Sequence, residues 1–133
     1  MSQVIRNNQK LHPRAIKGIE LFNQKKFFDA HEELELAWRD EKSQLRDLYR
    51  GILQIGVAYY HIQRRNFSGA KKLLDRSQKW LQPFSGLYLG INISKLKRDA
   101  VEINNKLINS YFQEISQIDD YLFPTIDFRF VED

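Results

Sequence analysis

Two ionisable side chains stand out in the segment FFDAHEELELAWRD, because they share one helical face with large apolar residues. At about 100° per residue, spacings of three, four and seven place His31, Glu35 and Trp38 on the same side of a helix. A buried imidazole or carboxylate needs a hydrogen-bond partner, a metal ion or water. We therefore expect His31 and Glu35 to mark a functional site on the core-facing stripe of this helix.

A second row of polar side chains follows the longest predicted helix, which covers about residues 44–65. Arg50, Gln54 and His61 are spaced by four and seven residues, and they therefore line one edge of its apolar stripe. If this helix packs against the preceding one, the two rows meet. We expect a polar pocket between the two helices.

Three kinds of chemistry fit such a pocket. His31, Glu35 and His61 are a suitable ligand set for a divalent metal such as zinc, iron or manganese, which would make hydrolysis accessible. Arg50 opposes a cation and would pair with Glu35, while Gln54 could fix a histidine tautomer, so a metal-free network or a small polar ligand also fits. General acid–base catalysis by His31 is the third alternative, although no nucleophilic side chain is evident nearby. Whether the protein is an enzyme stays open.

The composition limits the class of protein. The chain has 133 residues, which corresponds to one domain over residues 1–133, and it has no cysteine, which excludes disulfides and cysteine-ligated zinc. No apolar run approaches the roughly 20 residues that cross a bilayer, and the N-terminus lacks the apolar stretch of a secretory signal. We expect a cytoplasmic protein with no membrane partner.

The charge is unevenly distributed along the chain. The formal net charge is +4, but residues 64–106 carry ten basic and three acidic side chains, whereas residues 107–133 carry one and six. This pattern favours a solvated basic surface that an acidic tail partly neutralises, and nucleic-acid binding is the alternative.

The charge distribution supports a second hypothesis for the function, a helical-hairpin interaction module in which the His/Glu cluster is structural. It would bind a protein or nucleic acid through its basic face or through the loop with Phe84, Leu87 and Tyr88. A homo-oligomer is compatible with both hypotheses.

The elements that position these residues are predicted to be helical. Only six glycines and three prolines interrupt the chain, and no alternating β-branched run competes with the helical periodicity. We predict an all-α fold, a compact bundle of about five helices with an extended C-terminal tail. The helices are expected at residues 13–25, 27–40, 44–65 and 67–81, and from Asn92 or Ser94 to about Phe112.

A faint internal repeat indicates how the helices pair. A shift of forty residues aligns Phe27, Ala30 and Leu34 with Phe67, Ala70 and Leu74. This repeat predicts two stacked helical hairpins with tetratricopeptide-like packing. Gly51 and Gly56 each cost about 1 kcal/mol of helix propensity relative to alanine, which close approach of a neighbouring helix would compensate.

The tail sequence IDDYLFPTIDFRF contains Pro124 and a short apolar alternation. This pattern favours an extended strap laid over a groove rather than another helix.

Three stretches, FNQKKFFDAHEELELAWRD, YRGILQIGVAYYHIQRRNFSGAKKLL and YLGINISKL, resemble the bacterial and archaeal domain-of-unknown-function family number 309. The resemblance covers about residues 15–97 and leaves residues 93–133 as a C-terminal helix and tail. The family motif is a histidine, three residues, a glutamate, two residues and a tryptophan or tyrosine, which His31, Glu35 and Trp38 reproduce. The resemblance implies a compact helical bundle and a suspected metal site at this motif, without an established activity.

Overall fold

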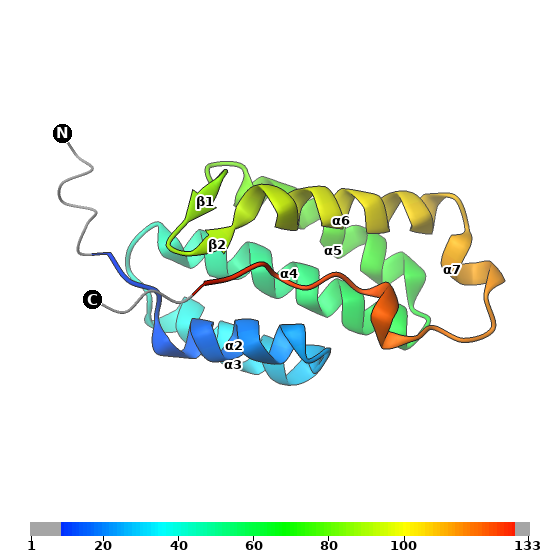
Figure 1. Cartoon of the computed structure of the whole chain (residues 1–133), viewed down its shortest axis with the longest axis horizontal. Coiled ribbons are helices and arrows are strands. Elements are labelled where there is room, and N and C mark those ends of the chain that lie inside the picture. Colours follow the sequence, from blue (N-terminus) through cyan, green and yellow to red (C-terminus); the bar gives the residue numbers. More distant parts are fainter. Residues whose placement is uncertain (1–8, 130–133) are drawn as a thin grey trace.

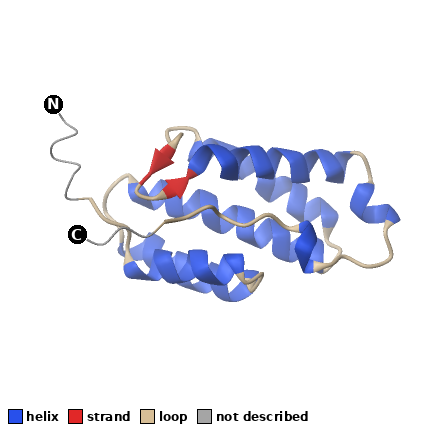
Figure 2. Ribbon diagram, in the orientation of Figure 1, coloured by secondary structure: helices blue, strands red, loops and turns tan. Residues whose placement is uncertain are grey.

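The fold is an array of helices in which each helix packs against the next, so the predicted all-α class is confirmed (Figure 1). The structure is a computed structural model that describes residues 9–129. Its helices are α2 (Pro13–Asn23), α3 (Phe27–Asp40), α4 (Leu45–Gln63), α5 (Phe67–Leu81), α6 (Ile93–Ile108) and the short α7 (Tyr111–Glu114). A two-stranded sheet, β1 (Leu87–Tyr88) and β2 (Ile91–Asn92), and a 3-10 turn, η1 (Asp120–Leu122), complete the described chain (Figure 2).

The turns of the two predicted hairpins have the same backbone geometry. Lys25 between α2 and α3 has φ 65°, and Arg65, forty residues later between α4 and α5, has φ 61°. The amide of each donates to a carbonyl three residues earlier, at 2.9 Å in both turns. Left-handed residues of this kind commonly end a helix. The forty-residue repeat therefore reflects a repeated hairpin turn as well as repeated core positions.

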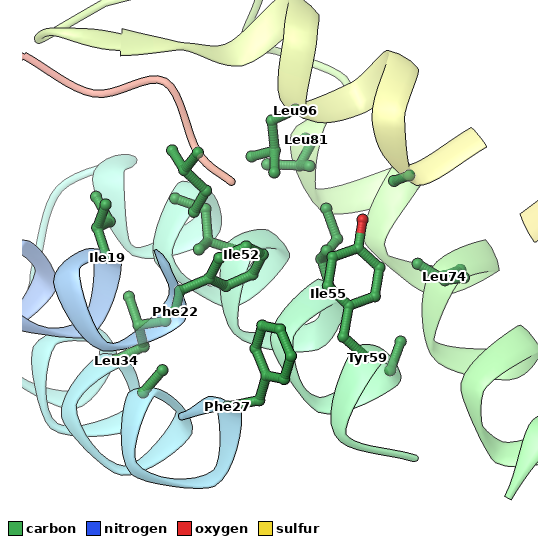
Figure 3. Packing of buried hydrophobic residues seen from close by; sticks show 14 of the residues in the cluster. Ile19, Phe22, Phe27, Leu34, Ile52, Ile55, Tyr59, Leu74, Leu81 and Leu96 are labelled. Atoms are coloured by element: carbon green, nitrogen blue, oxygen red, sulfur yellow. The ribbon is translucent and has the colours of Figure 1, made fainter. Parts of the chain in front are cut away.

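Helix α4 lies at the centre of the core, between α3 and α5 (Figure 1). Ile52, Ile55 and Tyr59 are fully buried along it (Figure 3). The rings of Phe22 and Phe27 lie 5.2 Å apart edge to face, and each is 5.6 Å from the ring of Tyr59. Aromatic pairs at this spacing stabilise a core beyond the area they bury. This cluster joins the first hairpin to the second.

The segment between α5 and α6 differs from the exposed aromatic loop that we expected. It forms the short antiparallel pair β1–β2, whose turn places Gly90 at φ 86°, where a Cβ would collide with the carbonyl oxygen of Arg129. Phe84 is buried, with its ring 5.5 Å from Tyr88, and only Leu87 is highly exposed. The prediction of an aromatic binding loop is therefore wrong for Phe84, because its side chain completes the core.

Helix α6 begins as predicted and ends early. The Asn92 side chain accepts a hydrogen bond from the Lys95 amide at 3.0 Å and caps the helix. The helix ends at Ile108 rather than near Phe112, because Ser110 has φ 62°, which breaks the helical path before α7.

The predicted extended tail is present. We define the C-terminal strap as residues 119–129; after η1 it runs extended between α2 and α6, in front of α4 (Figure 1).

Within residues 9–129, no helix combines the length and the apolar composition that a membrane crossing requires.

The substitution Gly51→Ala should destabilise the protein by about 1–3 kcal/mol, because overpacking strains a filled core. A Cβ at residue 51 would lie 2.5 Å from Cγ and Cδ2 of Leu81, which is buried. In the matched control Gly56→Ala, the Cβ would lie 3.4 Å from the Phe22 ring, and stability should be unchanged or higher. Urea unfolding of both variants is the measurement; equal losses would contradict the packing described here.

Tyr49 should make stability fall at alkaline pH. Burial raises the pKa of Tyr49 to about 12, although the His12 amide donates to its hydroxyl at 2.8 Å. An unfolded tyrosine has a pKa of about 10, so its contribution is complete below pH 10 and is lost as the pH rises towards 12. In Tyr49→Phe, urea midpoints measured across this range should fall less steeply than in the wild type; identical slopes would contradict the assignment.

Candidate functional site

The row of His31, Glu35 and Trp38 lies beside the buried stripe of α3, which corrects our expectation that it faces the core. The stripe is displaced from this row by one residue, or about 100° around the helix axis. All three side chains are therefore partly exposed, and water can solvate the two ionisable groups. The residues of α3 that are buried are Phe27, Ala30, Leu34 and Ala37.

The polar rows of α3 and α4 do lie side by side. At one end of the pair, the ring of Phe28 is 5.7 Å from the ring of Tyr60. At the other end, the Arg50 guanidinium is 5.1 Å from the centre of the Trp38 ring. The two helices are thus antiparallel, and the edge with Gln54 runs along the row of α3 between these ends. Arg50, Gln54 and His61 are all partly exposed.

Glu35 and Arg50 do not form the ion pair that we expected. Glu35 pairs instead with Arg39, one turn later on the same helix, at 3.6 Å. Both groups are substantially exposed, so this pair contributes little to stability. Arg50 lies between two indole rings, 5.1 Å from the centre of Trp38 and 4.2 Å from that of Trp80. The flat guanidinium stacks well on such faces, which explains its position.

The histidine partners also differ from the prediction. Asn66 caps α5 by accepting a hydrogen bond at Oδ1 from the Gly69 amide. Its Nδ2 then lies 3.4 Å from Nδ1 of His61, so Asn66, not Gln54, contacts this ring. Oε1 of Gln54 is buried without a hydrogen-bond partner. The ring of His31 lies 6.0 Å from that of Phe28 and makes no hydrogen bond with the described residues.

The geometry does not support the predicted metal ligands. Between residues 9 and 129, no three histidine, cysteine, aspartate or glutamate side chains are grouped so that they could hold a metal ion. Glu35 contacts Arg39, and His61 contacts Asn66. The set His31, Glu35 and His61 therefore does not fit a metal centre here, and we derive no reaction step through one.

The stack around Arg50 continues on both sides with two further cations that the sequence did not single out. Arg46 lies 5.4 Å from the Trp38 ring, and Lys79 lies 5.3 Å from the Trp80 ring. The sequence contained one sign of Arg46, because its four-residue spacing from Arg50 places both on one edge of α4. Trp80 gave no comparable signal, because it does not fall on the forty-residue repeat of Trp38.

We call this arrangement the tryptophan–arginine ladder. It crosses α3, α4 and α5, and its three cations have no ion pair or hydrogen bond through their side chains with any described residue. In order, its members are Arg46, Trp38, Arg50, Trp80 and Lys79.

Comparison with known proteins gives a family match without an assigned function. Residues 15–73 match the family described as "Domain of unknown function (DUF309)", which confirms the resemblance over that stretch. Over 65 residues, the chain is 37% identical to the "Uncharacterized protein YpuF" of Bacillus subtilis (strain 168). That alignment covers 48% of this chain and 37% of YpuF, so the chain matches well under half of its relative. Residues 74–133, which include the C-terminal strap, lie outside the family match.

Added zinc or manganese should not stabilise the protein, because the predicted ligands are not grouped. Thermal unfolding of protein without a histidine tag, with and without each metal, is the measurement, and His31→Ala is the control. We expect neither metal to shift the melting temperature of the wild type or of His31→Ala. A metal-dependent rise in the wild type that His31→Ala abolishes would restore the metal hypothesis.

Proposed function

We propose that this protein is a helical binding module that recognises anionic groups of a macromolecular partner through the tryptophan–arginine ladder. The observation that supports this proposal is the environment of the Arg50 guanidinium. Its guanidinium lies over two indole rings, 5.1 Å from the centre of Trp38 and 4.2 Å from that of Trp80, and its side chain makes no hydrogen bond or ion pair with the described residues. Stacking uses the faces of the guanidinium and leaves its N–H groups, which lie in the plane, for a ligand.

A stacked arginine is well suited to bind a carboxylate or a phosphate. Its N–H groups can contact two oxygens at once, and the flanking rings hold the fork in a fixed orientation. Little side-chain freedom is then lost on binding, which favours affinity. Arg46 beside Trp38 and Lys79 beside Trp80 add positive charge near Arg50, so the ladder offers three cations.

The charges around the ladder indicate where a polyanion would lie. On α5, Lys72 and Arg76 are exposed cations two turns and one turn before Trp80. On α3, Glu35 lies one turn before Trp38 and pairs with Arg39, so the charges at that end of the ladder offset each other. A polyanion is therefore attracted mainly to α5. We therefore expect the partner to lie over α4 and α5, with α3 at the edge of the interface. This orientation agrees with the basic region of residues 64–106.

The test is fluorescence anisotropy with two labelled probes of similar length and charge, a single-stranded oligonucleotide and a polyglutamate peptide. Arg50→Ala should weaken binding about tenfold or more, because a hydrogen bond to a charged group contributes about 1.5–3 kcal/mol. The affinity of Arg50→Lys should lie between those of the wild type and Arg50→Ala, because lysine keeps the charge and loses the planar fork. Affinity should decrease as salt rises, and the preferred probe identifies the class of partner.

The matched control is Lys17→Ala, which removes an exposed positive charge from α2, outside the ladder. Its binding should stay close to that of the wild type. The protein's two tryptophans, Trp38 and Trp80, both belong to the ladder. Their fluorescence should therefore change on binding, with the same dissociation constant as the anisotropy. Absence of binding to both probes at low salt, or equal losses in Lys17→Ala and Arg50→Ala, would refute the proposal.

A further inference from the structure

The C-terminal strap is held through its main chain, as a protein holds an extended peptide. Asn23 on α2 donates from Nδ2 to the carbonyl of Ile126 at 3.0 Å and accepts at Oδ1 from the amide of the same residue at 2.7 Å. Lys25 donates to the carbonyl of Phe123 at 2.8 Å. From the opposite side, Lys95 on α6 donates to the carbonyl of Thr125 at 3.0 Å.

After these hydrogen bonds, towards residue 129, the strap pairs with the edge of the two-stranded sheet. The Asn92 amide donates to the carbonyl of Asp127 at 2.9 Å, and the Arg129 amide donates to the carbonyl of Gly90 at 2.8 Å. Ile91 and Phe128 form an antiparallel bridge. Addition of an extended segment to a sheet edge is a common mode of peptide recognition.

Two side chains of the strap are buried against the helices. Phe123 is buried, and its ring lies 5.4 Å from both Phe27 and Tyr59. Ile126, three residues later, is also buried. The surface between α2 and α6 therefore combines polar contacts to the backbone with places for a phenyl group and an aliphatic group.

The beginning of the strap is less tightly packed than its middle. A cavity of about 230 Å³ lies between α6 and residues 121–124, lined on the helix side by Asp99, Glu102 and Lys106. Tyr121 is 80% exposed. The hydroxyl of Tyr59, whose ring packs against Phe123, is buried without a partner in this docked state. These features lower the cost of releasing the strap.

We propose that the surface between α2 and α6 is an extended-peptide site, and that the strap of a second copy of this chain can occupy it in place of the chain's own. The sequence that fits the site in the structure is residues 119–129, and a second copy brings the same sequence. The link that would open is residues 115–118, which are partly or fully exposed. Exchange of an identical element between protomers is a low-cost route to a dimer. This proposal is independent of the ladder.

The first test introduces a protease site within residues 115–118 of the full chain. After cleavage, a fluorescent peptide of residues 119–133 should replace the cleaved segment, with one peptide bound per chain and competition by unlabelled peptide. Asn23→Ala should weaken this binding about tenfold or more, because it removes two hydrogen bonds to the main chain of one residue, Ile126. The control Gln24→Ala, at the exposed neighbouring position, should bind like the parent.

The second test uses intact chains that carry two different dyes. The two populations are mixed, unfolded in urea and refolded together at high concentration, and then separated by size. Dimers with energy transfer between the dyes are expected, and Asn23→Ala should reduce their yield. Unfolding of the cleaved chain when the segment leaves, or failure of the segment to exchange, would refute the peptide site; refolding to monomers alone would refute the second copy as its occupant.

Discussion

Burial of α4 is the interaction on which the rest of the structure depends. Helix α4 packs between α3 and α5, and the rings of Phe22, Phe27 and Tyr59 join it to the first hairpin. Phe123 of the strap adds a further ring to the same cluster. Burial of apolar surface is the dominant favourable term in folding, and aromatic contacts of this kind add to it. It fixes the positions of both hairpins and of the strap at once.

One edge of α4 is only partly buried, and the candidate site lies there. Arg50 emerges from this edge between Trp38 of α3 and Trp80 of α5, so its position depends on how α4 holds its two neighbours. The packing of the core thus sets the geometry of the ladder. Metal chemistry would need three ligands to converge, whereas the ladder needs only flat rings on adjacent helices.

The sequence predicted the elements better than the directions in which their side chains point. Helix α5 has the predicted bounds, residues 67–81, and Asn92 caps α6 as expected. The spacing of His31 and Glu35 showed that they share a face, but periodicity alone does not say which neighbour that face meets. The contact of Trp80 with Arg50 joins residues thirty positions apart, and no local pattern encodes it. Strands of two residues are too short to show a period.

The strap also has a mechanical consequence. Its contacts follow one another along an extended chain, from Lys25 with Phe123 to Arg129 with Gly90. A pulling force applied at residue 129 would load these hydrogen bonds one at a time, as in the opening of a zipper, and not all together. The C-terminal strap would therefore peel away under a small force while α4 and its neighbours stay folded. Resistance to heat and resistance to tension need not coincide in this protein.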